Sequence, residues 1–219
     1  MTFSKEWNKR YEKHSDMSIW PWSDLVSYVM RYSHSNKKLR VLEIGCGAGA
    51  NIPFFLSLGY KYYGIEGSAI IIDKLKRRFP IIKKNIVTGD FTSEIPFDGK
   101  FDLVIDRSSL THNTTEGIKK CLDLVYDKMK NDSKYIGIDW FSTSHQDYSR
   151  AIKVDKYTRS GYTKGQFANV GIVHFSNKSH LKKLFKKFEI LALEHKIVIS
   201  QIPEKKEFAS WNFVAKKIN

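Results

Sequence analysis

The stretch VLEIGCGAGANI, from Val41 to Ile52, decides which fold the chain is expected to adopt. Its apolar first half predicts a buried strand, the glycines predict a tight loop, and the residues after the loop begin a helical pattern. Gly45, Gly47 and Ala50 match the spacing G-x-G-x-x-G/A, whose small residues let a ligand approach the backbone. This loop is therefore the first candidate for a binding site.

Strand and helix patterns alternate on both sides of the loop. Helical spacing is found at 69–79, between Ser68 as the expected N-cap and the proline stop Pro80, and again at 117–130. The expected strands cover 39–45, 60–66, the end of 81–90, 101–106, 134–141, 189–200 and 208–218. Alternation of this kind predicts an α/β fold with a mostly parallel, doubly wound sheet covered by helices.

The length of 219 residues is enough for one α/β domain and short for two. We therefore expect a single domain over 1–219, with an N-terminal helical cap at 1–38 and a polar, aromatic insert at 142–171. No apolar run approaches the roughly 18 residues that cross a bilayer, and the first residues lack the apolar core of a signal peptide. Two widely separated cysteines do not suggest a disulfide, so a cytoplasmic location is expected.

The formal net charge is +14, with 17 basic and 12 acidic residues in 1–110 and 20 and 11 in 111–219. Such a charge attracts nucleic acid, acidic membrane surfaces or small anions, and does not choose between them. Part of it belongs to SHLKKLFKKFEI, where a helical stripe of Leu181, Leu184, Phe185 and Phe188 predicts lysines on a solvated face.

Three kinds of ligand fit a glycine loop: a nicotinamide dinucleotide, a triphosphate and S-adenosylmethionine. Glu66 follows Gly45 by 21 residues, at a strand end, where a carboxylate can bind two ribose hydroxyls. The triphosphate pattern G-x-x-x-x-G-K-[ST] is absent. Glu43 would repel a pyrophosphate but can orient an ammonium group. In the sequence GDF, Asp90 can accept a hydrogen bond from an adenine amino group while Phe91 covers the ring.

Together, LEIGCGAG, YYGIEGS, TGDF and FDLVID resemble the class I S-adenosylmethionine-dependent methyltransferases in order and spacing. The resemblance covers roughly residues 39–140, and the terminal strands more loosely. It implies a Rossmann-like, seven-stranded sheet with a reversed last strand, and S-adenosylmethionine as the cofactor. The residues it implies at the cofactor are Glu43, Gly45, Gly47, Glu66, Gly67, Asp90, Phe91 and Asp106.

WNKRY and DRSSL resemble the thiopurine and tellurite-resistance methyltransferase group, in which an N-terminal aromatic segment folds over the methionine end of the cofactor. This resemblance implies that Trp7, Tyr11 and Arg107 lie beside the cofactor. An aromatic face near a sulfonium gains about 0.5–2 kcal/mol, and an arginine can pair with a carboxylate through two hydrogen bonds. The long insert departs from that group, so its substrates do not carry over.

Candidate catalytic residues follow the strands whose carboxyl ends form the ligand-binding edge of such a sheet. They are His112 after the fourth strand, and His145 with Asp147 after the fifth, where a carboxylate can raise the basicity of an imidazole. His174 comes before the last helix and is a candidate for substrate binding. Each of these histidines can also be structural. No H-x-x-x-H or C-x-x-C spacing predicts a metal site.

The insert is the expected substrate lid. Residues 141–180 hold six basic and two acidic side chains, interleaved with aromatic rings that include Phe141 and Phe167. The predicted substrate-binding residues are Tyr148, Lys153, Lys156, Arg159 and His174. The alternative is a solvated loop with a few packed rings.

The function predicted first is methyl transfer to a small, anionic metabolite, with the acceptor atom open between oxygen, nitrogen and sulfur. The alternative is an RNA or protein methyltransferase, for which the net charge is the argument. The tetrapeptide N/D-P-P-Y/F of many base-amine methyltransferases is absent, since DRSS stands at that place. A non-catalytic binding subunit and a nicotinamide oxidoreductase remain competing classes.

Overall fold

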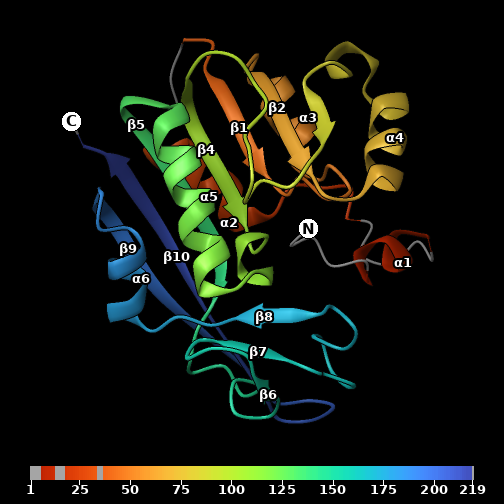
Figure 1. Cartoon of the computed structure of the whole chain (residues 1–219), viewed down its shortest axis with the longest axis vertical. Coiled ribbons are helices and arrows are strands. Elements are labelled where there is room, and N and C mark those ends of the chain that lie inside the picture. The colour runs from red at the N-terminus through yellow and green to blue at the C-terminus, as the bar shows by residue number, and fades with distance from the viewer. Residues whose placement is uncertain (1–5, 13–17, 34–36, 219) are drawn as a thin grey trace.

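A seven-stranded sheet in the order β3-β2-β1-β4-β5-β10-β9 forms the centre of the molecule (Figure 1). The computed structural model describes residues 6–12, 18–33 and 37–218. The strands are β1 (Arg40–Ile44), β2 (Lys61–Glu66), β3 (Ile86–Thr88), β4 (Phe101–Arg107), β5 (Met129–Phe141), β9 (Phe188–Ser200) and β10 (Lys206–Lys217). β1 to β5 are parallel, whereas β10 is antiparallel to both β5 and β9. The predicted α/β sheet with a reversed last strand is confirmed.

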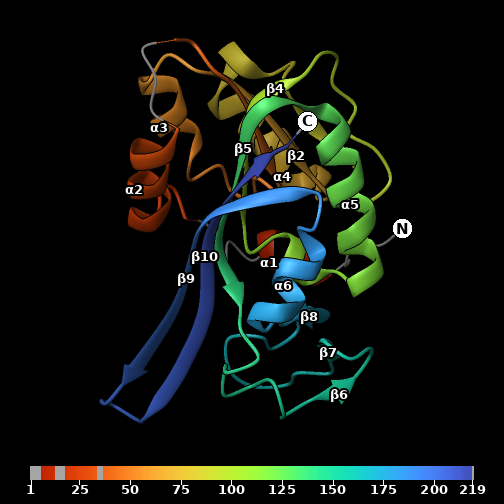
Figure 2. The same ribbon diagram turned by 90° about the vertical axis from the view of Figure 1, so that its left-hand side faces the viewer.

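Helices cover both faces of the sheet because successive strand residues point to opposite sides. In β1, Val41 packs into one core cluster and Leu42 into the other. One face is covered by α2 (Ser23–Tyr32), α3 (Ile52–Ser57) and α4 (Ala69–Arg78), and the other by α5 (Thr115–Lys128) and α6 (Lys178–Leu184). Figure 2 shows α2 and α3 on one side of the sheet and α5 and α6 on the other.

Side-chain caps fix the starts of two helices. Thr114 Oγ1 accepts a hydrogen bond from Gly117 N at 3.2 Å before α5, and Asn177 Oδ1 accepts one from His180 N at 2.8 Å before α6. The helical stripe predicted through Phe188 was too long, because α6 ends at Leu184 and Phe188 begins β9. Ser68 occupies the predicted N-cap of α4 but makes no side-chain capping bond.

The insert contains a second, antiparallel sheet made of β6 (Ile152–Lys153), β7 (Thr158–Ser160) and β8 (Ile172–His174), so it extends beyond the predicted 142–171 to the start of α6. The sequence suggested irregular structure here, and the strands are too short to produce a visible period. The insert has its own apolar cluster, which includes Phe141, Phe167, Val173 and Phe175. Figure 1 shows this sheet below the carboxyl ends of β1, β2 and β4. The segment is therefore a packed unit.

Helix α1 (Glu6–Glu12) lies between α4 and the insert (Figure 1). Tyr11 O accepts a hydrogen bond from Lys74 Nζ at 3.1 Å, and Arg10 Nη1 donates one to Ala168 O at 3.0 Å. Trp7 packs against the apolar cluster of the insert. These contacts place α1 over the carboxyl edge of the sheet.

Candidate active site

A cavity of about 540 Å³ opens at the carboxyl edge of the sheet, between the glycine loop, α1 and the insert. Eleven of the residues predicted from the sequence line it: Trp7, Tyr11, Glu43, Gly45, Gly47, Glu66, Gly67, Asp90, Phe91, Arg107 and His112. They come from five separate segments of the chain. The fold thus gathers most of the predicted cofactor residues around one space.

The glycine loop needs glycine at its first position for two reasons. Gly45 has φ +67°, in the region that side chains other than glycine rarely adopt. A Cβ atom there would also lie 2.2 Å from Ser109 Oγ. The Gly45 amide donates to Ile65 O at 2.8 Å, which holds the loop against β2.

Glu66 ties this loop to the end of β2. Its carboxylate accepts hydrogen bonds from Gly47 N at 3.0 Å and from Ser68 N at 3.2 Å. The side chain is buried at the cavity wall, and burial raises the pKa of its carboxyl although the backbone N–H groups oppose this shift. A carboxylate with oxygens held in this way is oriented before any ligand arrives.

Glu43 is held by two residues that the sequence analysis missed. Its carboxylate accepts hydrogen bonds from Asn51 Nδ2 at 2.7 Å and from Tyr62 Oη at 2.6 Å, while burial raises its pKa to about 7. Asn51 Oδ1 is buried and has no hydrogen-bond partner among the described residues. An acidic group beside a buried acceptor offers a place for an ammonium group.

Asp90 and Phe91 line the cavity after β3, close to the first glycine of the loop. Asp90 Oδ1 accepts hydrogen bonds from Thr92 N at 2.9 Å and Thr92 Oγ1 at 2.6 Å, so the turn orients the carboxylate. The Phe91 ring lies over the loop, with an edge atom 3.7 Å from where a Cβ of Gly45 would stand. This pair can meet a flat ring with both a hydrogen-bond acceptor and an apolar face.

Asp106 does not line the cavity, which corrects its prediction as a cofactor residue. It is fully buried and accepts hydrogen bonds from Ser109 N at 2.9 Å and Leu110 N at 3.2 Å. Burial raises its pKa to about 7. Asp106 therefore caps the 3₁₀ turn Leu110–His112 and positions Ser109, which lies against Gly45.

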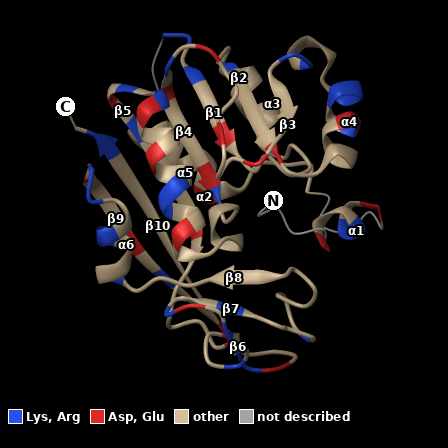
Figure 3. Ribbon diagram, viewed as in Figure 1, with Lys and Arg blue, Asp and Glu red and all other residues tan. Residues whose placement is uncertain are grey.

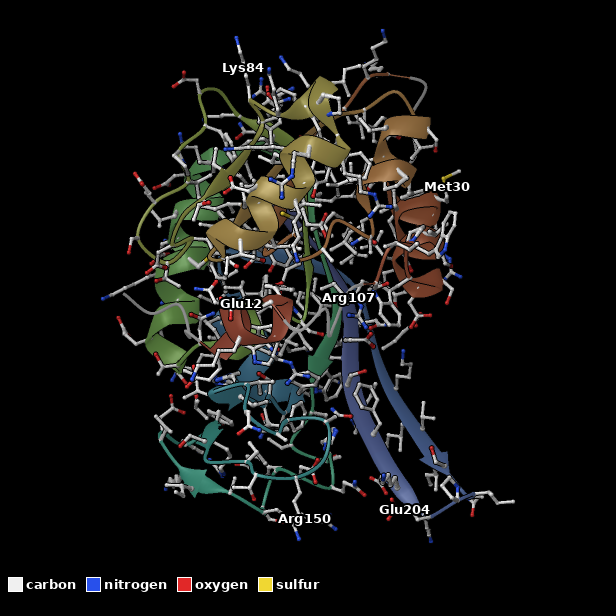
Figure 4. The ribbon with its side chains drawn as sticks, turned by 90° about the vertical axis from the view of Figure 1, so that its right-hand side faces the viewer. Glu12, Met30, Lys84, Arg107, Arg150 and Glu204 are labelled. Atoms are coloured by element: carbon white, nitrogen blue, oxygen red, sulfur yellow. The ribbon has the colours of Figure 1, made fainter. Side chains whose placement is uncertain are left out.

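Arg107 lines the cavity within a network of charges. Its Nη2 is 3.1 Å from Asp139 Oδ2, and its guanidinium carbon is 3.6 Å from the centroid of the Trp22 ring. Lys196 Nζ lies 3.0 Å from Asp139 Oδ1 and 2.6 Å from Asp24 Oδ2. The network joins the ends of β4 and β5 to α2 and β9. Figure 4 shows Arg107 at the middle of the molecule, beside β10.

His112 is the one predicted catalytic residue that lines the cavity. Its Nδ1 is 3.2 Å from Ile172 O in the insert, and its ring meets that of Trp7 edge to face, with centroids 5.0 Å apart. The residue therefore connects the 3₁₀ turn after β4 with both α1 and the insert.

The predicted pair of His145 and Asp147 does not form a catalytic base. His145 is buried outside the cavity lining, and its Nδ1 lies 4.0 Å from Asp147 Oδ2. Nδ1 accepts a hydrogen bond from Asp147 N at 3.1 Å instead. Burial lowers the pKa of His145, and this outweighs the effect of the nearby carboxylate.

His174 lies inside the insert, which corrects its prediction as a substrate residue. It is fully buried, with Nδ1 3.0 Å from Thr158 Oγ1 and Nε2 3.2 Å from His180 Nε2. Burial lowers the pKa of His174 to about 3 and that of His180 to about 4. The charged side chains that act on this pair are Asp155, Lys119, Lys156 and Lys183.

The buried histidines predict a pH dependence of stability. Their pKa values are depressed from 6.5 in the folded state, so the unfolded chain binds more protons below pH 6.5. Stability should be full above that value and fall as the pH approaches 4, with a loss of about 2 kcal/mol per histidine at pH 5. Urea unfolding at pH 7.5 and 5.0 measures this loss of stability in the wild type and in His174→Asn. An equal loss in both proteins would contradict the prediction for His174.

The predicted cationic lid residues do not reach the cavity. Lys153 and Lys156 are exposed and lie outside its lining. Arg159 donates to Tyr148 O at 3.0 Å and Asp155 O at 3.1 Å, and its guanidinium lies 4.2 Å from the Tyr148 ring centroid. Arg159 and Tyr148 therefore hold the insert together. Figure 4 shows Arg150 at the outer end of the insert, far from Arg107.

Several lining residues were missed by the sequence analysis as site residues. They are Arg10, Trp22, Asn51, Asp139, Gln166, Val170 and Phe208. Of these residues, Asp139 was the easiest to predict from the sequence, since an acidic residue within the apolar run IGIDWF is unusual in a buried strand.

In the described part of the chain, no three His, Cys, Asp or Glu residues are grouped to hold a metal ion. None of the described helices is long and apolar enough to span a membrane.

Comparison with known proteins identifies the central segment. Residues 41–132 match the model of a methyltransferase domain. This segment is a methyltransferase domain, and domains of this kind take the methyl group from S-adenosylmethionine. The enzyme class, the cofactor and the resemblance drawn from the motifs are therefore confirmed. No curated protein sequence matches the chain.

Solved structures share the fold at low sequence identity. A SAM-dependent methyltransferase from Methanosarcina mazei is 16% identical, with a TM-score of 0.68 over 91% of this chain and 99% of that chain. TehB from Haemophilus influenzae is 15% identical, with a TM-score of 0.64 over 96% and 67%. The 1,6-didemethyltoxoflavin-N1-methyltransferase from Burkholderia thailandensis is 13% identical, with a TM-score of 0.66 over 98% and 85%. These likenesses establish the class I methyltransferase fold of the whole chain.

Proposed function

We propose that the cavity binds S-adenosylmethionine along the glycine loop and that the chain transfers its methyl group to a small molecule held beside the insert. The observation that carries this proposal is Glu66. A buried carboxylate at the end of β2 faces the cavity and is oriented by Gly47 N and Ser68 N. It stands where two ribose hydroxyls can donate to it.

The other residues of the loop suit the remaining parts of that cofactor. Asp90 and Phe91 would receive the adenine, as a hydrogen-bond acceptor and an apolar cover. Glu43 and the unpartnered Asn51 Oδ1 would receive the ammonium group. Arg107 keeps donors beyond its bond to Asp139 and would receive the carboxylate. The bound cofactor supplies a methyl group that is activated by the positive sulfur.

The chain's own contribution is to align the acceptor and exclude water. Holding two reactants in a near-attack geometry can account for about 7–11 kcal/mol of a barrier. Beside the cavity, α1 meets the insert through Arg10 Nη1 and Ala168 O, and the turn after β4 meets it through His112 Nδ1 and Ile172 O. These contacts would shield the reaction from solvent.

The charges of the lining favour a small acceptor with at most one anionic group. Arg10 and Arg107 are its basic residues among those described, against four acidic ones, Glu43, Glu66, Asp90 and Asp139. An acidic lining suits a cationic sulfonium and disfavours a polyanion. Acidic positions lie in β1 and at the ends of β2 and β4, whereas many basic ones lie on outer helices such as α4 (Figure 3). An anionic acceptor remains a prediction from the sequence.

Calorimetry tests the proposal. S-adenosylmethionine and S-adenosylhomocysteine should both bind the chain with one site, and NAD should give no binding heat, because Glu43 would repel a pyrophosphate. Binding of NAD without binding of S-adenosylmethionine would refute the proposed site. Incorporation of labelled methyl groups into RNA, with none into small molecules, would replace the small acceptor by the RNA alternative.

A further inference from the structure

The outer edge of β9 has no strand beside it in the described part of the chain. β9 is the last strand of the seven-stranded sheet, and β10 is its partner there. The register between the two is shifted at Val214 and Ala215 but is unbroken along β9 from Ala192 to Ser200. β10 pairs with β5 only from Ser210 onward, so the β9–β10 hairpin reaches beyond the end of β5 (Figure 2). The N–H and C=O groups along such a long edge can pair with a strand of another chain.

This edge lacks the features that usually protect an edge strand from pairing, which are outward lysines, prolines and bulges. The stretch ALEHKIVIS, 192–200, holds one lysine and no proline. That lysine is turned toward α2, since Lys196 Nζ lies 2.6 Å from Asp24 Oδ2 and 3.0 Å from Asp139 Oδ1. Three consecutive apolar residues follow it and are nearly half exposed: Ile197 at 48%, Val198 at 47% and Ile199 at 46%.

The sequence of the edge is complementary to itself. Two copies of β9 can pair antiparallel about His195, so that this residue lies opposite the same residue of the partner. Residues directly opposite each other on antiparallel strands contact through their side chains, and opposite charges or apolar pairs there stabilise a sheet. On each side of the centre, the pairs would be Glu194 with the partner's Lys196, Leu193 with the partner's Ile197, and Ala192 with the partner's Val198.

The neighbouring registers lack this match. Centring the pair on Glu194 or on Lys196 would place two like charges opposite each other, which destabilises a sheet. In the register about His195, both charged side chains can reach their partners. The Glu194 side chain is 55% exposed, with Arg31 Nη1 3.9 Å from its Oε1, and an exposed pair of this kind contributes little. Lys196 has three N–H donors and contacts two carboxylates, so a third donor remains.

We propose that the edge of β9 binds a second copy of the chain, so that two copies form a two-fold dimer with one continuous sheet. A two-fold contact occupies both edges at once, and assembly therefore stops at the dimer. An interface built on one edge strand is small, so we expect dissociation in the micromolar range. The inference concerns assembly and does not depend on the proposed methyl transfer. Because β10 supplies Phe208 to the cavity lining, the dimer would also hold a strand of the candidate active site.

Sedimentation velocity of the full chain at increasing concentration tests the proposal, and we expect a shift from monomer to dimer. Glu194→Lys would place a lysine opposite the partner's Lys196 on both sides of the axis, and should weaken the dimer roughly tenfold. Glu116→Lys, the same change at an exposed position of α5, should leave the dimer intact. Ile197→Lys should also weaken the dimer, whereas Ile152→Lys, at an exposed position of β6, should not.

Cysteine crosslinking tests the register. Opposite residues have Cα atoms about 4.5–5.5 Å apart, within the range that a disulfide spans. Mild oxidation should therefore link two copies of His195→Cys, and should not link Ile197→Cys, an exposed position that faces the partner's Leu193. The native Cys46 and Cys121 are buried and do not interfere. If His195→Cys does not fold, a mixture of Leu193→Cys and Ile197→Cys should crosslink, while each variant alone should not.

Three results overturn the proposal. They are a chain that stays monomeric at high micromolar concentration, a dimer that Glu194→Lys and Ile197→Lys leave unchanged, and crosslinking of Ile197→Cys alone as fast as that of His195→Cys. A monomer that cosediments with phosphatidylcholine vesicles, and loses this binding in Ile197→Lys, would assign the apolar edge to a membrane surface and overturn the proposal as well.

Discussion

Replacing Glu66 by alanine is expected to weaken S-adenosylmethionine binding at least tenfold, while the chain stays folded. The proposed ribose contacts are charge-assisted hydrogen bonds of about 1.5–3 kcal/mol each, and 1.4 kcal/mol corresponds to a tenfold change in affinity. The variant also removes the acceptor of Gly47 N and Ser68 N, so the loop loses part of its preorganisation. Loss of both ribose contacts would bring the effect to a hundredfold or more.

Glu66→Gln makes the test more specific. An amide has one oxygen, so its NH₂ group would face either Gly47 N or Ser68 N, two donors that cannot bond to it. We therefore expect it to weaken binding nearly as much as Glu66→Ala. Glu94→Gln is the matched control, since Glu94 is exposed and outside the cavity lining. Calorimetry with S-adenosylhomocysteine measures all three, and an unchanged dissociation constant in folded Glu66→Ala would refute the assignment.

The parts of the site that could be predicted from the sequence depend on local geometry. Gly45 and Gly47 follow a strand and precede a helix, and the parallel sheet brings Glu43, Glu66 and Asp90 to the edge where that loop lies. Side chains at strand ends keep their positions relative to one another whatever the loops do. For this reason most of the predicted cofactor residues line the cavity, whereas none of the predicted substrate residues does.

The positions of the predicted catalytic and substrate residues depend on contacts that no sequence spacing reveals. Arg159 lies among aromatic residues in the sequence, yet the turn of the insert places several backbone carbonyls around its guanidinium. His145 has a carboxylate two residues away, yet a backbone N–H reaches its ring first. The fold of the long insert decides which of its aromatic and basic side chains face the cavity. Its strands are only two or three residues long, so the sequence shows no periodic pattern from which this fold could be predicted.

The charge network around Asp139 was missed for a different reason. Its members come from α2, the end of β4 and the last two strands. These segments are far apart in the sequence, so they meet only in the folded sheet. Asp139 has φ +54° and donates its N–H to Asn212 Oδ1 at 2.9 Å. Backbone strain at a cavity wall is typical of functional sites. The sequence offered one hint, a carboxylate inside an apolar strand.

The largest loss of stability is expected from Gly45→Ala. Alanine at φ +67° is strained by about 1–2 kcal/mol, and the new methyl group would stand 2.2 Å from Ser109 Oγ and 2.3 Å from Ser109 Cβ. Overpacking of this kind costs about 1–3 kcal/mol more. The loop can relieve the overlap only by moving away from Ser109, which would displace the amide that donates to Ile65 O. We therefore expect both lower stability and weaker cofactor binding.

Two further variants separate strain from overlap. Gly59→Ala has the same backbone problem, with φ +70°, but nothing lies within 4 Å of its new methyl group, so it should lose about 1–2 kcal/mol and bind cofactor normally. Ser109→Gly removes both atoms that Gly45→Ala would strike. In the double variant, the overlap should vanish and the remaining cost should approach that of Gly59→Ala. Urea unfolding of these variants gives the coupling energy between Gly45 and Ser109.

A coupling energy near zero would mean that the glycine loop in solution does not pack against the turn after β4. In that case the contact between Gly45 and Ser109 would not be what aligns the glycine loop with the end of β4.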